Sequence, residues 1–480
     1  MRRTLISTLV VALAGCSSTP KTAEQQFLDD TMTAIGGRAN IDALRSIVIE
    51  GTGVNYNLGQ DMKPEAATQT FELTGYKRQI DIASNRQLIE QVRTPKFTYF
   101  QGPQPQKQVQ ALEGEVAFNV SESGQSSRLQ AWAERDRRSE FLHHPATALK
   151  VAASPGVSIA NVRTTGAVRQ ADFTLGDRTW TLTIDAGGLP LSVSHRSYHA
   201  NLGDVVITTT FANYQEVSGL KLPTHLVTKV DDFTTAEIRV TTQAINTPFT
   251  APEGVNAAAV KPAVTPTPNV TAERVGTGVW LLAGQSHHSV LVEFADHLML
   301  IDAPQSEART LAVIAKAKDT VKNKPLTQLV TTHHHFDHTA GLRAAIAEGM
   351  SVFTHAGNKE WVENMARRPH TLAPDALTKS ATRLVVETVD DEREVKDASQ
   401  TVMLYHVAGN PHSDTMLMAY IPRDRLIIEV DAFSPGSAVQ PYAPNLLENI
   451  QKRSLRVDKI VPLHGAIAPF SELVKVGGAK

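Results

Sequence analysis

The chain has 480 residues, of which 41% are hydrophobic and 20% are charged, and its formal net charge is -2. This composition is typical of a globular protein and excludes a collagenous or largely disordered chain. A net charge near zero without a basic stripe gives no electrostatic footprint for nucleic acid, so we expect no nucleic-acid partner. The length predicts at least two domains.

The chain starts with MRRTLISTLVVALAGC, in which two arginines precede an apolar run that is too short to span a bilayer. The last four residues, LAGC, resemble the lipobox of bacterial lipoproteins and end at Cys16, the only cysteine of the chain. The resemblance implies a signal peptide over residues 1–15, lipidation of Cys16 and a tether over residues 16–25. The alternative is an ordinary secretory signal. We expect an envelope location, at the periplasmic face of the outer membrane, with membrane contact through the lipid.

Residues 26–248 are expected to form a β-rich domain. A helix is predicted for AEQQFLDDTMTAIGG, ending at Gly36 and Gly37. Runs with period-two alternation follow and predict a curved antiparallel sheet, among them SIVIEGTGVNY, ATQTFELTG, TWTLTIDA, LPLSVSHRSY and VVITTTFANYQ. The order of helix and long meander resembles the half-barrels of periplasmic lipoprotein-carrier proteins. That resemblance implies an acyl or lipid ligand in this domain.

Residues 249–271 are rich in Pro, Ala and Thr and show no periodicity, which predicts an extended linker. Beyond it, residues 272–480 are expected to form a second domain. Strand-like runs such as LTQLV and SVFTH alternate there with helical stretches such as SEARTLAVIAKAKD and TAGLRAAIAEG. This alternation predicts a layered α/β domain, whose functional residues are expected in the loops at the strand ends. The whole chain is thus predicted to be a multidomain protein of α+β and α/β type.

One loop of the second domain, THHHFDH at residues 332–338, is unusually rich in histidine. His333 and His335 are expected to project to the same side, and Asp337 and His338 follow on the turn into a helix. Imidazole nitrogen and carboxylate oxygen are ligands that Zn²⁺ accepts, so the loop is able to serve two metal ions. His334 points the opposite way and is interpreted as a residue that either supports a ligand or packs in the core, and not as a ligand itself.

Three further candidate ligands occur at the ends of later apolar strands. His412 follows a Gly-Asn-Pro turn, Asp431 ends the run RLIIEVDAF, and His464 ends the run KIVPLHG. Their regular placement favours a metal site over a polar turn without metal.

The motif Thr-His-x-His-x-Asp-His, with a Gly three residues later, resembles that of the metallo-β-lactamase superfamily. The resemblance implies an αββα sandwich holding two Zn²⁺ ions. It also implies that His333, His335 and His412 hold the first zinc, that Asp337, His338 and His464 hold the second, and that Asp431 bridges them. The subclass of β-lactamases with a cysteine ligand is excluded because the only cysteine, Cys16, is the predicted site of lipidation.

Two zinc ions sharing one water lower its pKa towards ~7, so that hydroxide is present at neutral pH. The predicted function is a zinc-dependent hydrolase of a small ester, thioester, lactone or amide, in which the catalytic Asp337 orients the nucleophile. Two alternatives remain open: a true β-lactamase, and a lipid- or lipoprotein-binding carrier in which the N-terminal domain dominates. The segment NMARRPHTLAPDAL around His370 is interpreted as a solvated loop, with a lid over the site as its alternative.

Overall fold

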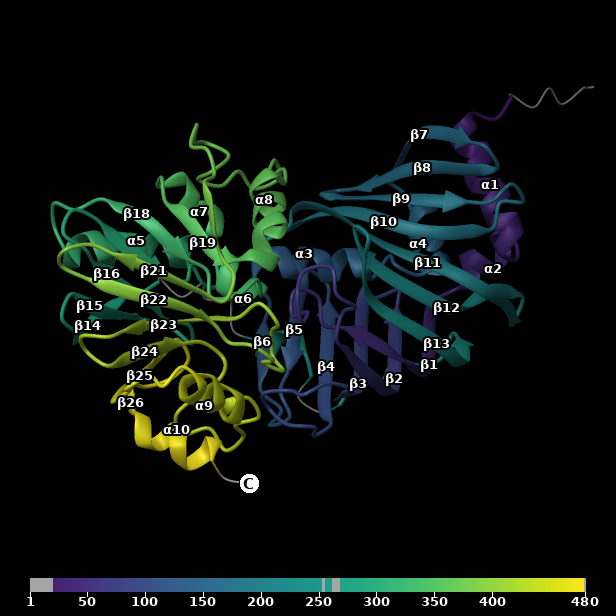
Figure 1. Ribbon diagram of the computed structural model, residues 1–480. Coiled ribbons are helices and arrows are strands. Elements are labelled where there is room, and N and C mark those ends of the chain that lie inside the picture. Colours follow the sequence, from purple (N-terminus) through teal and green to yellow (C-terminus); the bar gives the residue numbers. More distant parts are fainter. Residues whose placement is uncertain (1–19, 253–254, 261–267, 479–480) are drawn as a thin grey trace, which may run out of the picture.

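The computed structural model describes residues 20–252, 255–260 and 268–478 (Figure 1). The predicted signal peptide, Cys16 and the first residues of the tether lie outside them. Within the described residues, no helix is long and apolar enough to cross a membrane.

The N-terminal domain is built on one antiparallel sheet of thirteen strands in the order β6-β5-β4-β3-β2-β1-β13-β12-β11-β10-β9-β8-β7. Neighbouring strands are consecutive in sequence, except that β1 pairs with β13 in the middle of the sheet. The predicted antiparallel sheet with helices is therefore confirmed. The strands are β1 (Ser46–Tyr56), β2 (Thr70–Asp81), β3 (Arg86–Pro95), β4 (Gln106–Glu113), β5 (Val116–Val120), β6 (Ser126–Arg128), β7 (Ser158–Thr165), β8 (Val168–Leu175), β9 (Arg178–Ile184), β10 (Pro190–His199), β11 (Gly203–Val217), β12 (Leu220–Val230) and β13 (Phe233–Ile245).

Four helices pack against this sheet: α1 (Ala23–Ile35), α2 (Arg38–Ala43), α3 (Ala131–Glu140) and α4 (Pro145–Ala152) (Figure 1). Helix α1 begins after Thr22, whose side chain accepts a hydrogen bond from Gln25 N, and it ends at Gly36 as predicted. Its apolar face, with Phe27 and Met32, joins the core of the sheet.

Part of the predicted linker packs against the N-terminal domain. Phe249, Val255 and Val260 contact a small apolar cluster around Leu88 and Phe118, on β3 and β5. The segment includes one short helix, η1 (Ala257–Ala259).

The C-terminal domain has two sheets packed face to face, with strand orders β14-β15-β16-β17-β18-β19-β20 and β21-β22-β23-β24-β25-β26. A large apolar core fills the space between them. Helices α5, α7 and α8 cover the first sheet, whereas α9 and α10 lie on the second, so the expected αββα order is present (Figure 1). The strands are β14 (Thr271–Gly276), β15 (Val279–Ala283), β16 (Ser289–Glu293), β17 (Leu298–Ile301), β18 (Leu326–Val330), β19 (Ser351–His355), β20 (Val386–Val389), β21 (Glu392–Lys396), β22 (Thr401–His406), β23 (Leu417–Ile421), β24 (Leu426–Glu429), β25 (Lys459–Pro462) and β26 (Ala468–Pro469). The helices are α5 (Glu307–Thr320), α6 (Phe336–Thr339), α7 (Leu342–Ala347), η2 (Ala356–Asn358), α8 (Lys359–Arg367), α9 (Ala443–Lys452) and α10 (Phe470–Gly477).

The segment after α8 joins the two domains. Arg368 forms an ion pair with Asp231, and Thr371 N donates to Asp204 Oδ2 at 3.0 Å. His370 is only 2% exposed and its Nδ1 lies 3.3 Å from the hydroxyl of Tyr198. The interpretation of this segment as a solvated loop is wrong in part: its first residues belong to helix α8 and His370 is buried, whereas Pro369, Thr371 and Leu372 are exposed.

Candidate metal centre

The seven predicted ligand side chains meet at one edge of the C-terminal sandwich. The loop after β18 and helix α6 carry four of them, and three later loops carry the others. They are His333, His335, Asp337 and His338, then His412 before β23, Asp431 after β24 and His464 after β25. Residues up to 131 positions apart in sequence are thus brought together because the strand ends lie at the same edge.

A first group comprises His333, His335, His412 and Asp431, whose ligand atoms all lie within 4.8 Å of one another. His335 Nδ1 and His412 Nε2 are 3.0 Å apart, and His412 Nε2 is 3.0 Å from Asp431 Oδ2. His333 Nε2 is buried and lies 3.3 Å from Asp431 Oδ2, so the same carboxylate oxygen is close to both His333 and His412.

A second group comprises Asp337, His338, His464 and a residue that the sequence analysis did not select, His287. His338 Nε2 and His464 Nε2 are 3.1 Å apart. His287 Nε2 lies 3.2 Å from Asp337 Oδ2, and its ring packs at 4.1 Å between centroids against that of His464.

Asp431 lies between the two groups. One carboxylate oxygen, Oδ2, is 3.0 Å from His412 Nε2 and 3.1 Å from His338 Nε2, while Oδ1 is 2.9 Å from His464 Nε2. Its backbone has a φ of 55°, which is uncommon for a residue other than glycine. Strain of this kind concentrates at functional sites, where the surrounding structure enforces it.

Outer hydrogen bonds hold several of these imidazoles in place. His338 Nδ1 donates to the buried Asp302, at 2.9 Å, and His464 Nδ1 donates to the carbonyl oxygen of Ser286, at 2.8 Å. Asp302 also accepts from the backbone N–H and the hydroxyl of Thr332, each at 2.8 Å. Partners of this kind fix which ring nitrogen is free to bind a metal.

The three carboxylates beside His338 favour its positively charged form. Burial by itself disfavours a charged His338, but Asp431, Asp337 and Asp302 outweigh it and raise the pKa of His338 well above its usual value. Burial also opposes the charged form of Asp337, yet His338 and the hydrogen bond from His287 lower its pKa. For His333 the effect of burial outweighs that of the nearby Asp431 carboxylate. Its pKa is lowered to about 4, so the side chain is neutral at neutral pH.

A loop of the N-terminal domain, residues 57–69 between β1 and β2, reaches the centre. Gln60 Nε2 donates to Asp337 Oδ1 at 2.8 Å, and His335 Nε2 donates to the carbonyl oxygen of Asp61 at 2.8 Å. The carbonyl oxygen of Gly59 accepts from Phe336 N at 3.1 Å. The N-terminal domain therefore contributes two contacts to predicted ligands.

Three residues of the site were not selected from the sequence: His287, Asp302 and Gln60. His287 gives a weak signal, because it precedes strand β16 in a His-His pair. Asp302 ends an apolar strand in the same manner as Asp431. Nothing in the sequence around Gln60 indicates a role at the site, because Gln60 belongs to the N-terminal domain and reaches the ligands only in the folded protein.

His334 lies outside both groups, in agreement with the interpretation that it is not a ligand itself. Its Nδ1 is 3.3 Å from the hydroxyl of Thr415, and its ring packs edge-on against Trp361 with centroids 6.0 Å apart.

The residues present fit a pair of metal ions. They offer imidazole nitrogen and carboxylate oxygen in two groups, and one carboxylate, that of Asp431, lies against imidazoles of both groups.

Comparison with known proteins agrees with this fold. Residues 282–428 match the family model described as the metallo-beta-lactamase superfamily. The C-terminal domain of the chain is therefore a metallo-β-lactamase-fold domain.

Several solved structures are similar to this chain. A metallo-beta-lactamase from Pontibacter korlensis is 18% identical over 44% of this chain and 98% of that chain, with a TM-score of 0.35. The metallo-beta-lactamase FIM-1 from Pseudomonas aeruginosa, in its mono-zinc form, is 18% identical over 45% of this chain and 96% of that chain, with a TM-score of 0.35. The metal-soaked Flv1 flavodiiron core from Synechocystis is 13% identical over 44% of this chain and 61% of that chain, also with a TM-score of 0.35.

Proposed function

We propose that the chain is a dinuclear zinc hydrolase that cleaves an ester, thioester, lactone or amide. The observation that carries the proposal is the pair of ligand groups that meet at the Asp431 carboxylate. His333, His335 and His412 would hold one ion, Asp337, His338 and His464 the other, and Asp431 would be shared. Bound there, the two ions would supply Lewis acidity and a water of lowered pKa.

The contribution of the chain itself centres on Asp337. Gln60 holds its Oδ1 and His287 lies against its Oδ2, so the carboxylate has a fixed orientation. The lowered pKa keeps Asp337 ionised at neutral pH, as a residue that accepts a hydrogen bond from the attacking water must be. His287 would stabilise this orientation as a positioning residue.

The substrate would enter beside the ligand loop. A cavity of about 470 Å³ lies against His334 and Phe336, between the loop at residues 57–69 and helix α8. Leu58 and Trp361 give it an apolar wall, and its charged side chains are of both signs: Arg367, Arg368, Asp61, Glu65 and Glu360. Such a lining suits a substrate with an apolar part and a polar end.

We also propose, from the sequence alone, that Cys16 is lipidated and that the protein faces the periplasm from the outer membrane. Loss of [³H]palmitate incorporation on Cys16→Ser substitution, in cells fed the label, is the expected result. Equal labelling of the variant would contradict lipidation at this residue.

The proposed reaction is tested with zinc-loaded full-length protein on a panel of nitrocefin, lactones, thioesters and phosphodiesters. Hydrolysis of an acyl substrate is expected, together with its loss after chelation and in an Asp337→Ala/His412→Ala double variant. His406→Ala is the matched control, because His406 lies outside both ligand groups. Full activity in the double variant would contradict the proposal. Turnover of nitrocefin alone would favour the β-lactamase alternative.

A further inference from the structure

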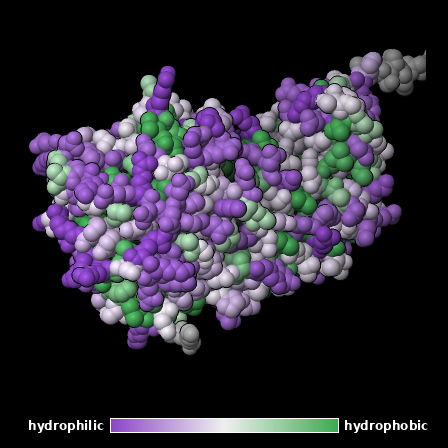
Figure 2. Space-filling model, viewed as in Figure 1, coloured by the Kyte–Doolittle hydropathy of each residue, from purple (hydrophilic) through white to green (hydrophobic). Residues whose placement is uncertain are grey.

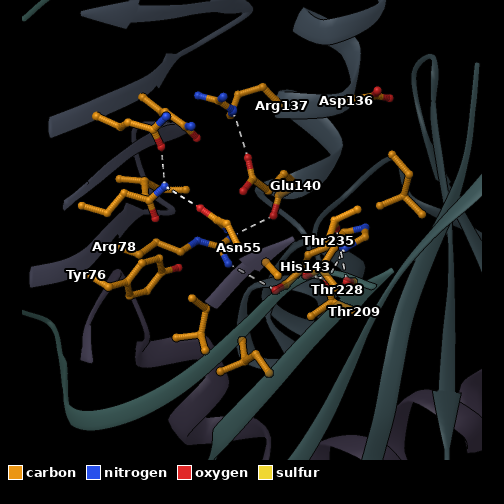
Figure 3. Close-up of a pocket in the computed structure, with 18 of the residues that line it drawn as sticks. Asn55, Tyr76, Arg78, Asp136, Arg137, Glu140, His143, Thr209, Thr228 and Thr235 are labelled. Atoms are coloured by element: carbon orange, nitrogen blue, oxygen red, sulfur yellow. Dashed lines mark hydrogen bonds and ion pairs between the residues drawn. The ribbon is translucent and has the colours of Figure 1, made fainter. Parts of the chain in front are cut away.

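The N-terminal domain contains a second cavity, of about 600 Å³, whose lining includes none of the candidate metal ligands. It lies between the sheet and helix α3, and residues of strands β1 to β5 and β10 to β13 line it. Figure 3 shows part of this lining. Its volume is within the range of small-molecule sites, roughly 300–1,000 Å³.

The walls of this cavity are rich in side-chain amides. On neighbouring strands, Gln91 donates to Gln108 Oε1 at 2.8 Å and to Asn55 Oδ1 at 3.3 Å. Gln110 and Asn119 face each other across β4 and β5, and neither side chain has a hydrogen bond within the described residues. A hydrocarbon chain placed here would remove water from these amides without replacing its hydrogen bonds. Apolar side chains such as Ile89, Leu226 and Ile238 also line the cavity, so its wall combines amides with an apolar surface.

Most charged groups of the cavity already have partners. The guanidinium of Arg78 donates to Gln87 Oε1 and to the carbonyl oxygens of Glu140 and His143, which ties helix α3 and the following turn to the sheet. Arg137 Nε lies 2.9 Å from the Glu140 carboxylate. Figure 3 shows Arg137 and Glu140 on one side of the cavity and Arg78 with Tyr76 on another.

One guanidinium group of the lining, that of Arg93, has no acidic partner among the described residues. Arg93 donates through Nε to Gln106 Oε1 at 2.7 Å and lies over the ring of Phe71, 4.3 Å from its centroid, but forms no ion pair with any described residue. Burial lowers the pKa of Arg93, which reflects the cost of a charge without a counter-ion. A carboxylate on the ligand would supply that counter-ion.

Aromatic rings complete the lining. Phe71, Tyr56 and Tyr76 all border the cavity. Phe71 and Tyr76 are almost fully buried, so they give the cavity an apolar wall. This wall, the free amides and the unneutralised guanidinium of Arg93 together match a ligand that has apolar faces, hydroxyl groups and a negative charge.

We propose that this cavity binds an acidic saccharide, with the sugar carboxylate at Arg93 and hydroxyl groups at Gln110 and Asn119. The proposal rests on the N-terminal domain alone and does not depend on the proposed hydrolase activity.

Calorimetric titration of the full-length protein tests it, with trigalacturonate as probe, maltotriose as the neutral comparison and laurate as the hydrocarbon comparison. Trigalacturonate is expected to bind at least ten-fold more tightly than maltotriose and than laurate. Arg93→Gln should weaken trigalacturonate binding about ten-fold or more, because it removes a charge-assisted contact.

The control is Arg239→Gln, which removes a guanidinium that is 71% exposed on β13, outside the cavity lining, and it should leave affinity unchanged. A Gln110→Ala/Asn119→Ala variant, which breaks no internal hydrogen bond, provides a second measurement if Arg93→Gln fails to fold. It should weaken trigalacturonate and maltotriose alike. Tighter binding of laurate, no binding of trigalacturonate at millimolar concentration, or wild-type affinity in both cavity variants would overturn the proposal.

Discussion

At the scale of single residues, Asp302 has a decisive position beside the ligand loop. Its side chain is fully buried. It accepts two hydrogen bonds from Thr332 and one from His338 Nδ1. Because it orients a predicted ligand without being one, Asp302→Asn should weaken zinc affinity about 10–100-fold. Competition with a chromophoric chelator measures this affinity.

Asp424→Asn serves as its control, because Asp424 accepts hydrogen bonds from Thr277 far from the ligand groups. Wild-type zinc affinity in a folded Asp302→Asn variant would show that Asp302 does not position His338.

The neighbours His334 and His335 allow a direct comparison. His335→Ala should lower the zinc content of the protein, whereas His334→Ala should keep it and lose only packing against Trp361. Zinc analysis of both dialysed variants distinguishes these outcomes. Equal zinc loss in the two variants would contradict the assignment of His334 as a packing residue.

The sequence alone was enough to select the seven candidate ligand side chains, but not the residues that form hydrogen bonds to them. Ligand residues such as His412 and Asp431 follow apolar strands, and strand ends of a sandwich meet at one edge, so local pattern was informative. Gln60 and the Asp61 carbonyl approach the site through tertiary structure alone. Such a contact between domains leaves no periodic signal in a single sequence.

At the scale of elements, the conformation of the loop at residues 57–69 requires a glycine at position 59. Its φ is 78°, and an added Cβ would lie 2.2 Å from the ring of Phe336. Gly59→Ala should therefore displace the loop, weaken zinc affinity and lower the free energy of unfolding by more than the roughly 1–2 kcal/mol expected from left-handed strain alone. Urea unfolding and zinc titration measure the two effects.

Gly75→Ala is a matched control, since Gly75 also has a positive φ, 59°, but no atom within 4 Å of an added Cβ. Equal destabilisation in the two variants, with unchanged zinc affinity, would mean that the loop does not support the centre.

The bounds of strands whose residues alternate regularly between apolar and polar could be predicted closely from the sequence. The run SIVIEGTGVNY is strand β1 and SVFTH is strand β19. In contrast, the predicted run ATQTFELTG covers only the first part of strand β2, which continues to Asp81 because a bulge at residues 74–77 interrupts the alternation without ending the pairing. The polar helix α3, which covers the second cavity, has no buried apolar side chain that would give it a periodic pattern.

At the scale of the whole molecule, two domains pack side by side and share polar contacts (Figure 1). The face shown in Figure 2 is mostly hydrophilic, with scattered hydrophobic residues. The two-domain organisation followed from length and the Pro-rich segment. The packing of the domains did not, because ion pairs such as Arg368–Asp231 join residues far apart in sequence.

Buried histidines in both parts of the molecule make stability depend on pH. Burial lowers the pKa of His144 to about 3 and that of His370 to about 4. Below pH 6.5 the unfolded chain binds protons that the folded state does not, so the free energy of unfolding should fall by about 1.4 kcal/mol per pH unit for each such group. Urea unfolding at pH 6.5, 5.5 and 4.5 measures the slope. His144→Gln should reduce it, and an unchanged slope would exclude His144 as its source.

The central claim is that the chain binds two zinc ions through seven side chains. The most direct test is the zinc content of full-length protein, loaded with zinc and dialysed against metal-free buffer, by inductively coupled plasma mass spectrometry. We predict two zinc ions per chain. Fewer than one zinc ion per chain would contradict the account.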